Sequence, residues 1–174
     1  CCPLGVAYRA DGKRRLILDA TYLNRSLAPP RFKHETLHQL GEILEPSDHL
    51  LSLDLTSGYH HVDLHPSAWP YMGFSWEGID YVFRVLPFGV NTAPFVFTQV
   101  TGVLTERWRA LGIRLLHYLD DYLFGTSAAA IPRTRRQVVS DLLAAGFQIN
   151  LDKSSLAGAR CLRHLGFDVD MDRN

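Results

Sequence analysis

The sequence predicts an α+β fold. Apolar runs of strand length interleave along the chain with segments of helical periodicity. In the second half, two apolar runs are separated by only two residues, which indicates a tight hairpin. The 174 residues are the length of one domain or of a piece of something larger, and 47% hydrophobic with 21% charged residues is ordinary globular usage. This composition excludes a disordered tail, a collagen-like repeat and a low-complexity linker.

The first half is expected to contain short strands and one short helix. Pro29 and Pro30 indicate an exposed loop, because proline fits neither a helix interior nor a central strand. Apolar spacing over residues 36–44 suits one short amphipathic helix. Four apolar runs are expected to be strands: residues 15–18, 49–55, 71–76 and 81–85. The last two are joined by residues 77–80 and predict a hairpin.

Two helices stand out in the second half. The first follows Asn91 or Thr92, either of which can cap it, and it ends at Gly112. The second runs from about residue 131 to residue 145, with Gly146 as its end. Two later apolar runs are expected to be closing strands: residues 147–151 and 161–169.

Three carboxylates are the candidate chemical centre. Asp120 and Asp121 lie between the apolar runs 113–119 and 122–124, at the tip of the predicted tight hairpin. Adjacent carboxylates repel each other unless a positive charge lies beside them, although Asp is also common in ordinary solvated turns. Asp54 ends another buried strand, so pairing in one sheet would bring all three together. Such a cluster suits hard divalent cations, and two ions roughly 3.5–4 Å apart support nucleotidyl transfer.

Five motifs occur in order along nearly the whole chain. They are Leu53-Asp54-Leu55-Thr56-Ser57-Gly58-Tyr59-His60; Leu86-Pro87-Phe88-Gly89-Val90 with Ala93-Pro94 and Phe97; Tyr118-Leu119-Asp120-Asp121; Gly146-Phe147 with Asn150 and Lys153; and Leu165-Gly166-Phe167. In this order and spacing the series resembles the fingers and palm of reverse transcriptases. The closest likeness is to retroelement enzymes of the gypsy type and of the tyrosine-recombinase-bearing retrotransposons.

The resemblance implies a right-hand polymerase palm, an antiparallel sheet backed by helices, with part of the fingers. Residues 1–48 would be a fingers-like segment and residues 49–174 the palm, with a fingers-like insertion near residues 66–90. The family's thumb and RNase H parts have no counterpart in these 174 residues. Because the chain begins with Cys rather than Met, we expect an excised piece of a longer polyprotein.

The same resemblance assigns the metal site. Asp54, Asp120 and Asp121 would be catalytic and hold two Mg²⁺ ions, for which Mn²⁺ is a possible substitute. Tyr59 matches the aromatic gate that abuts the sugar 2′-carbon and selects deoxynucleotides. Without the motif, Tyr59 reads as an ordinary core aromatic residue.

Four further residues are candidates for contact with the nucleotide and its leaving group. Arg9 and Arg15 match the basic positions of a fingers hairpin that folds onto the triphosphate, and arginine is a bidentate phosphate donor. Lys153 matches a lysine proposed to protonate the pyrophosphate, although a surface lysine is equally expected there. Phe88 matches a nucleotide-contacting position at which many retroviral relatives carry Gln.

The resemblance implies an RNA-directed DNA polymerase. Its partners would be an RNA or DNA template with a primer, dNTP, and the thumb and RNase H parts of the parent polyprotein. A catalytically inactive nucleic-acid-binding remnant and a metal-dependent phosphohydrolase are the alternatives. Eighteen basic and 18 acidic residues give zero net charge, which argues against a histone-like chain. No apolar run is long enough to span a bilayer, and an intracellular location is expected for a retroelement protein.

Histidines and cysteines offer a weaker metal hypothesis. His60, His61 and His65 lack a fourth ligand at zinc spacing and are better explained as exposed turn residues. Three cysteines, two of them adjacent at the start of the chain, form neither a disulfide framework nor a metal pattern.

Overall fold

The computed structural model describes residues 1–8, 12 and 14–173, and the chain divides into two compact units. The first unit comprises Cys1–Phe32 and Tyr59–Gln99, and the second comprises Lys33–Gly58 and Val100–Asn174. Both contain antiparallel strands together with helices, so the predicted α+β class is confirmed. Arg9, one of the predicted nucleotide contacts, lies outside the described residues.

The first unit is built on two hairpins. Strand β1 (Leu4–Tyr8) pairs with β2 (Arg14–Leu18), and β4 (Gly73–Trp76) pairs with β5 (Ile79–Val82). The β4–β5 hairpin was predicted, but its strands close on Glu77-Gly78 rather than on four residues. The unit also contains the short helix α1 (Thr21–Asn24), the 3₁₀ helix Pro66–Met72, and all but the first residue of the 3₁₀ helix Gly58–His61.

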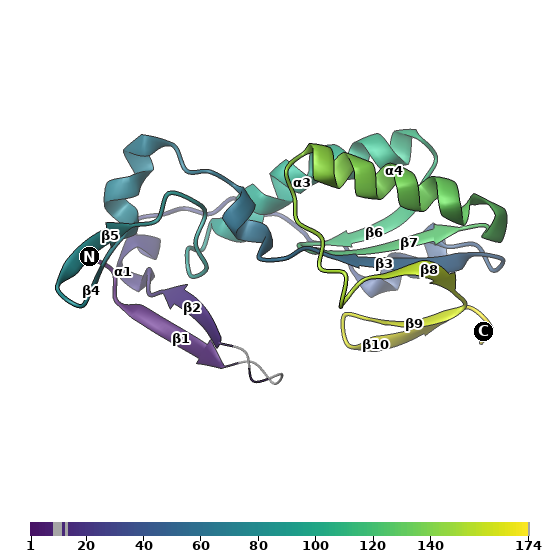
Figure 1. Cartoon of the computed structure of the whole chain (residues 1–174), viewed down its shortest axis with the longest axis horizontal. Coiled ribbons are helices and arrows are strands. Elements are labelled where there is room, and N and C mark those ends of the chain that lie inside the picture. Colours follow the sequence, from purple (N-terminus) through teal and green to yellow (C-terminus); the bar gives the residue numbers. More distant parts are fainter. Residues whose placement is uncertain (9–11, 13, 174) are drawn as a thin grey trace. The chain divides into compact units, whose positions relative to one another are not determined.

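The second unit contains a four-stranded antiparallel sheet with the strand order β6-β7-β3-β8. Its strands are β3 (His49–Asp54), β6 (Arg114–Tyr118), β7 (Asp121–Thr126) and β8 (Ser155–Ala159). Helix α4 (Ile131–Ala144) and the part of α3 (Ala93–Ala110) that belongs to this unit lie over one face of the sheet, as Figure 1 shows. A separate hairpin of β9 (Cys161–His164) and β10 (Phe167–Asp170) follows β8.

Successive side chains along each strand point to opposite faces of this sheet, and both faces are buried. On the helix side, Trp108 of α3 packs edge-on against Tyr122 and Phe124, with ring centroids 5.5 Å apart in each case. On the other side, a fully buried cluster of Leu50, Leu116 and Leu123 is covered by residues of two short segments. The covering residues are Leu37, Leu40, Ile43, Leu44, Leu162, Leu165, Val169 and Met171.

The helix predicted over residues 36–44 is shorter than expected. It consists of a 3₁₀ turn, Leu37–Gln39, followed by α2 (Leu40–Ile43). The Gln39 side chain accepts the backbone N–H of Thr36 at 2.8 Å and caps the start. Leu44 is already extended. Pro46 disfavours helical backbone in Glu45, the residue before it, so the helix could not have continued far beyond this point.

The predicted closing strands also differ. Residues 147–151 make one isolated bridge, Leu55 to Ile149, and then turn, because the Asn150 carbonyl accepts the N–H of Lys153 at 3.2 Å. Residues 161–169 are not one strand but the β9–β10 hairpin, whose turn places Leu165 and Gly166 at positive φ. The Leu165-Gly166-Phe167 motif therefore contains a hairpin turn.

Candidate carboxylate site

The three predicted carboxylates meet at one end of the second unit's sheet. Asp54 is the last residue of β3 and Asp121 the first of β7, and their Cα atoms are register partners. The backbone carbonyl of Asp120, in the adjacent turn, accepts the N–H of Leu55 at 3.1 Å. The sheet therefore holds two strand ends and one turn together, as the sequence predicted.

The hairpin turn lies one residue earlier than predicted. Tyr118 and Asp121 are paired, so the two turn residues are Leu119 and Asp120 rather than Asp120 and Asp121. Leu119 has a φ of 54°, in the left-handed region that non-glycine residues avoid. A positive φ at the first central position matches the twist of a two-residue hairpin, which explains the turn but leaves a leucine in a strained conformation.

Burial and neighbouring negative charges together set the electrostatics of this site. Burial is the largest effect on Asp121; together with the charges of Asp120 and Asp54 and a hydrogen bond with Asp54, and against the opposing effect of Lys153, it raises the pKa of Asp121 to about 7. Asp121 therefore titrates near neutral pH, far above the ordinary range of an aspartate. Such a shift marks a place where a cation would be favoured.

Asp54 is held from a third segment of the chain. Asn150 donates its side-chain N–H to Oδ1 at 2.9 Å, and Lys153 Nζ lies 3.5 Å from Oδ2. The backbone N–H of Asp54 donates to Oγ of Ser154 at 3.1 Å. The turn after Ile149 thus brings Lys153, a predicted site residue, onto the carboxylate cluster.

The donor set fits a hard divalent cation by its chemistry. Three carboxylates supply oxygen ligands, and the repulsion at Asp121 is what a bound cation would relieve. Within residues 1–8, 12 and 14–173, however, no three His, Cys, Asp or Glu side chains are arranged to hold a metal ion. Binding would therefore require the carboxylates to turn toward the ion, and the shared hydrogen bond between Asp54 and Asp121 would have to break.

The first unit contains an aromatic column that ends in a guanidinium. The Tyr59 ring stacks on Phe88 with centroids 4.9 Å apart and also contacts Phe97 at 5.1 Å. Arg15 lies over the other member of this stack, with its Cζ 4.4 Å from the Phe88 centroid. His60 packs edge-on against Phe88 at 5.3 Å. Two predicted nucleotide contacts, Arg15 and Tyr59, thus both pack against a third, Phe88.

A glycine fixes the loop that carries Phe88. Gly89 has a φ of 113°, and a Cβ there would collide with the carbonyl oxygen of Leu18 at the end of β2. Asn24 closes the loop, since its side chain donates to the Gly89 carbonyl at 2.9 Å and accepts the N–H of Asn91 at 2.9 Å. The glycine of the Leu86–Val90 motif is therefore required for close approach to β2.

The histidines and cysteines do not form a metal site in the part of the chain that the structure describes. His60 is part of the aromatic packing, and His65 Nδ1 lies 2.9 Å from Oγ of Ser67. Cys1, Cys2 and Cys161 are free thiols.

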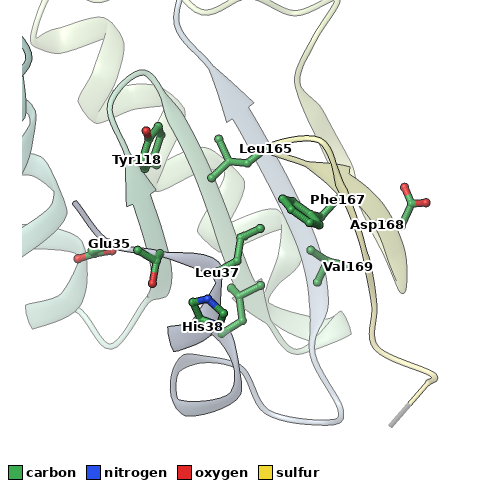
Figure 2. Close-up of a pocket in the computed structure, with 10 residues that line it drawn as sticks. Glu35, Leu37, His38, Tyr118, Leu165, Phe167, Asp168 and Val169 are labelled. Atoms are coloured by element: carbon green, nitrogen blue, oxygen red, sulfur yellow. The ribbon is translucent and has the colours of Figure 1, made fainter. Parts of the chain in front are cut away.

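A largely apolar pocket of about 760 Å³ lies in the second unit, as Figure 2 shows. Tyr118 and Phe167 border it together with Leu37, His38 and Leu165. Of the predicted site residues that the structure describes, none lines this pocket. The carboxylate cluster and the pocket are therefore separate features, connected through Tyr118, which pairs with Asp121.

Sequence reasoning missed one buried polar residue beside the carboxylates. His117 is 6% exposed and contacts Thr101, Thr105 and Leu119. The available signal was a polar residue within the otherwise apolar run 113–119, followed directly by the motif that carries Asp120.

Comparisons of the sequence with known proteins find relatives that cover nearly the whole chain. Residues 11–169 match the family model described as reverse transcriptase (RNA-dependent DNA polymerase). Protein P of a duck hepatitis B virus is 29% identical over 167 residues, which are 93% of this chain and 21% of that protein. The retrovirus-related Pol polyprotein from transposon opus of Drosophila melanogaster is 29% identical over 160 residues, 91% of this chain and 16% of that protein. The chain thus spans only a small part of these relatives.

A solved structure shares the fold. The foamy viral protease-reverse transcriptase, determined in complex with an RNA/DNA hybrid, superposes with a TM-score of 0.83 at 22% identity. The match covers 98% of this chain and 22% of that one. The likeness shows that the predicted fold, a polymerase palm with part of the fingers, is correct.

Proposed function

The chain belongs to the reverse transcriptase (RNA-dependent DNA polymerase) family, and we propose that it provides the catalytic centre for joining a deoxynucleotide to a primer 3′-hydroxyl. The convergence of Asp54, Asp120 and Asp121 at one sheet end carries this proposal. An RNA template with its growing DNA strand is the substrate we favour, because the foamy viral relative was solved with an RNA/DNA hybrid. A DNA template is the alternative substrate.

In this proposal the three carboxylates hold two Mg²⁺ ions, for which Mn²⁺ can substitute. The ions supply activation of the primer hydroxyl and neutralisation of phosphate charge when they are bound. The chain's own contribution is a fixed sheet end and a carboxyl, Asp121, that releases its proton near pH 7. Lys153, 3.5 Å from Asp54 in this structure, is the candidate proton donor to the pyrophosphate leaving group.

The aromatic column of the first unit is proposed to contact the incoming nucleotide. Tyr59 would exclude a 2′-hydroxyl, and its stacking on Phe88 supports a fixed ring position. Arg15 would bind triphosphate oxygens, together with Arg9. Because a cation–π contact holds the Arg15 guanidinium over Phe88, its donors would be oriented before the nucleotide arrives.

We also propose that the chain works as part of a longer retroelement polypeptide. The relatives named above are several times longer, and one of them is a transposon Pol polyprotein. A gypsy-type or tyrosine-recombinase-bearing element is the origin we favour, because Phe88 stands where many retroviral relatives carry Gln. Thumb and RNase H parts would add the remaining grip on template and primer, in an intracellular setting.

Primer extension on matched RNA and DNA templates tests the proposal, in the 174-residue chain and in the full-length polypeptide. Asp120→Asn should abolish extension while leaving the unfolding midpoint nearly unchanged. Glu106→Gln, the same carboxylate-to-amide change at an exposed position of α3, is the matched control and should extend normally. Full extension by the Asp120 variant would remove the carboxylate assignment. Nucleic-acid binding without extension by the unmodified full-length protein would favour the inactive remnant instead.

A further inference from the structure

His117 is enclosed on every side beside the turn that carries Asp120. Its ring lies parallel to that of Tyr122, with an interplanar angle of 3° and centroids 4.5 Å apart. Nε2 lies 2.7 Å from the carbonyl oxygen of Leu119, and Nδ1 lies 3.0 Å from Oγ1 of Thr105. Oγ1 of Thr101 is 3.2 Å from Nε2. A histidine held at both nitrogens and across its face has one orientation.

These contacts also select one tautomer. A carbonyl oxygen can only accept, so Nε2 must carry the proton that it donates to Leu119. Nδ1 is then an acceptor, and the Thr105 hydroxyl donates to it at 3.0 Å rather than to the more distant Thr101 carbonyl oxygen at 3.4 Å. Both ring nitrogens are satisfied in the neutral form, which is the form that a buried imidazole favours.

The surroundings keep the ring neutral. Burial lowers the pKa of His117, and the charges of Arg109 and His34 act in the same direction. The bond to the Leu119 carbonyl and the charge of Glu35 oppose them. Burial is the largest effect, so the neutral form persists at physiological pH.

The acceptor of this bond is the strained residue of the turn. Leu119 has a φ of 54°, a conformation that is unfavourable for a non-glycine residue unless its surroundings hold it. The carbonyl that His117 binds belongs to the peptide unit between Leu119 and Asp120. On the other side of Asp120, its own carbonyl accepts the Leu55 N–H at 3.1 Å. The backbone of Asp120 is therefore held on both sides.

We propose that His117 is a positioning residue that sets the direction of the Asp120 carboxylate through the Leu119 carbonyl. The inference rests on the proposed function only in that Asp120 belongs to the catalytic cluster. His117 contacts neither substrate nor metal in this role. It fixes a peptide plane that the hairpin alone would leave free to flip.

Two measurements on the folded chain test this role. Long-range ¹⁵N–¹H correlation spectra should show His117 with its proton on Nε2 and none on Nδ1, and that proton should exchange slowly with solvent. A proton on Nδ1, or a fast-exchanging ring, would overturn the proposal without any variant being needed. Thr105→Val, which removes only the hydroxyl at Nδ1, should shift the Nδ1 resonance; an unchanged resonance would also count against it.

Variants then separate positioning from stability. In the full-length polypeptide, His117→Leu should lower the single-turnover extension rate between about 10- and 100-fold, with primer-template affinity unchanged. His117→Gln keeps an N–H donor of similar reach and should recover most of that rate. Val138→Ala, a core truncation in α4, supplies a comparable loss of stability and should leave the rate near normal.

The outcomes are distinguishable from those of the proposed function. If Asp120→Asn extends normally, the carboxylate assignment itself fails. If Asp120→Asn is inactive while His117→Leu is as fast as the unmodified protein, only the positioning role fails. Equal rates for the Leu and Gln variants, both folded, would also overturn it, because the donor would then be irrelevant. If neither variant folds, the tautomer spectrum of the unmodified chain decides.

Discussion

Asp54 and Asp121 face each other across β3 and β7, and a hydrogen bond joins their carboxyl groups. Two carboxyl groups can share such a bond only when one of them carries a proton. Without a cation, the two carboxyl groups of this pair therefore either share a proton at neutral pH or repel each other as two negative charges. A bound divalent cation offers a third state in which both are ionised, which is why proton and metal should compete here.

The first prediction concerns stability against pH. The pKa of Asp121 is about 7 in the folded chain, against 3.8 as its ordinary value. Between these values the folded state binds more protons than the unfolded state, so this group's stabilisation is complete below about pH 4 and is lost as the pH rises to 7. The slope should not exceed about 1.4 kcal/mol per pH unit. Urea unfolding of the unmodified chain and of Asp121→Asn across this range isolates the effect.

The free energy of unfolding of Asp121→Asn has to be subtracted from that of the unmodified chain, because His164 titrates in the same pH range. Burial lowers the pKa of His164 to about 4, so its stabilisation is lost as the pH falls, which is the opposite sign. This contribution is common to both proteins and cancels.

Added Mg²⁺ should stabilise the unmodified chain more at pH 8 than at pH 5. An equal Mg²⁺ effect at both pH values would contradict the coupling of proton and metal.

The second prediction concerns sugar selection. Tyr59→Val should raise ribonucleotide relative to deoxynucleotide incorporation about 10- to 100-fold, because the ring that would exclude a 2′-hydroxyl is gone. Phe88→Leu keeps apolar volume but removes the stacked ring 4.9 Å from Tyr59, so we expect a smaller change in the same direction. Single-turnover incorporation of matched nucleotides measures both. Tyr22→Val, at an exposed tyrosine, should change nothing.

The proximity of Asp54 and Asp121 could be predicted because strand ends are recognisable in the sequence. Asp54 ends one apolar run and Asp121 directly precedes another, and antiparallel pairing of the two strands brings both residues to the same end of the sheet. The hairpin turn was placed one residue late, since Asp is a better turn former than Leu and nothing local signals a leucine at positive φ. The strained residue becomes intelligible only with the His117 bond that holds its carbonyl.

Most structural features that the sequence did not predict depend on contacts between segments that are far apart in the chain. Arg15 lies over Phe88, 73 positions further along the chain, and no local pattern specifies that pairing. The segment 147–151 looked like a strand because of its apolar residues. Instead, the backbone N–H of Asn150 donates to the Asp54 carbonyl at 2.9 Å and its side-chain N–H donates to Oδ1 of Asp54 at 2.9 Å, after which the chain turns. Both contacts are made to a residue 96 positions away, so no local pattern specifies them.

The third prediction concerns an ion pair beside β3 between a buried carboxylate, Asp48, and a partly exposed guanidinium, Arg114. Asp48 is fully buried, and Arg114 donates to both of its carboxylate oxygens, from Nε at 3.1 Å and from Nη2. The Glu45 N–H also donates to Asp48, at 2.9 Å. Arg114→Met would strand a buried charge and should lower the free energy of unfolding by about 3–5 kcal/mol.

Chemical denaturation of a double-mutant cycle checks this prediction. Asp48→Asn combined with Arg114→Met should cost less than the sum of the single changes, because the stranded charge is gone. Arg135→Met, at an exposed arginine of α4, should stay within about 0.5 kcal/mol of the unmodified chain. Additive losses in the cycle would mean that the two side chains act independently.

The last prediction uses the glycine that makes room for this pair. A Cβ at Gly125 of β7 would lie 2.6 Å from Oδ2 of Asp48 and would collide with Cδ2 of Leu44. Because Asp48 is held by Arg114 and cannot retreat, Gly125→Ala should destabilise the chain by about 1–3 kcal/mol. Gly102→Ala is the matched control: it lies within α3, where a new Cβ meets nothing within 4 Å. There the helix propensity of alanine should raise stability by about 0.5–1 kcal/mol. Urea midpoints of both variants should thus move in opposite directions, and a Gly125 variant as stable as the unmodified chain would show that β7 can shift away from Asp48.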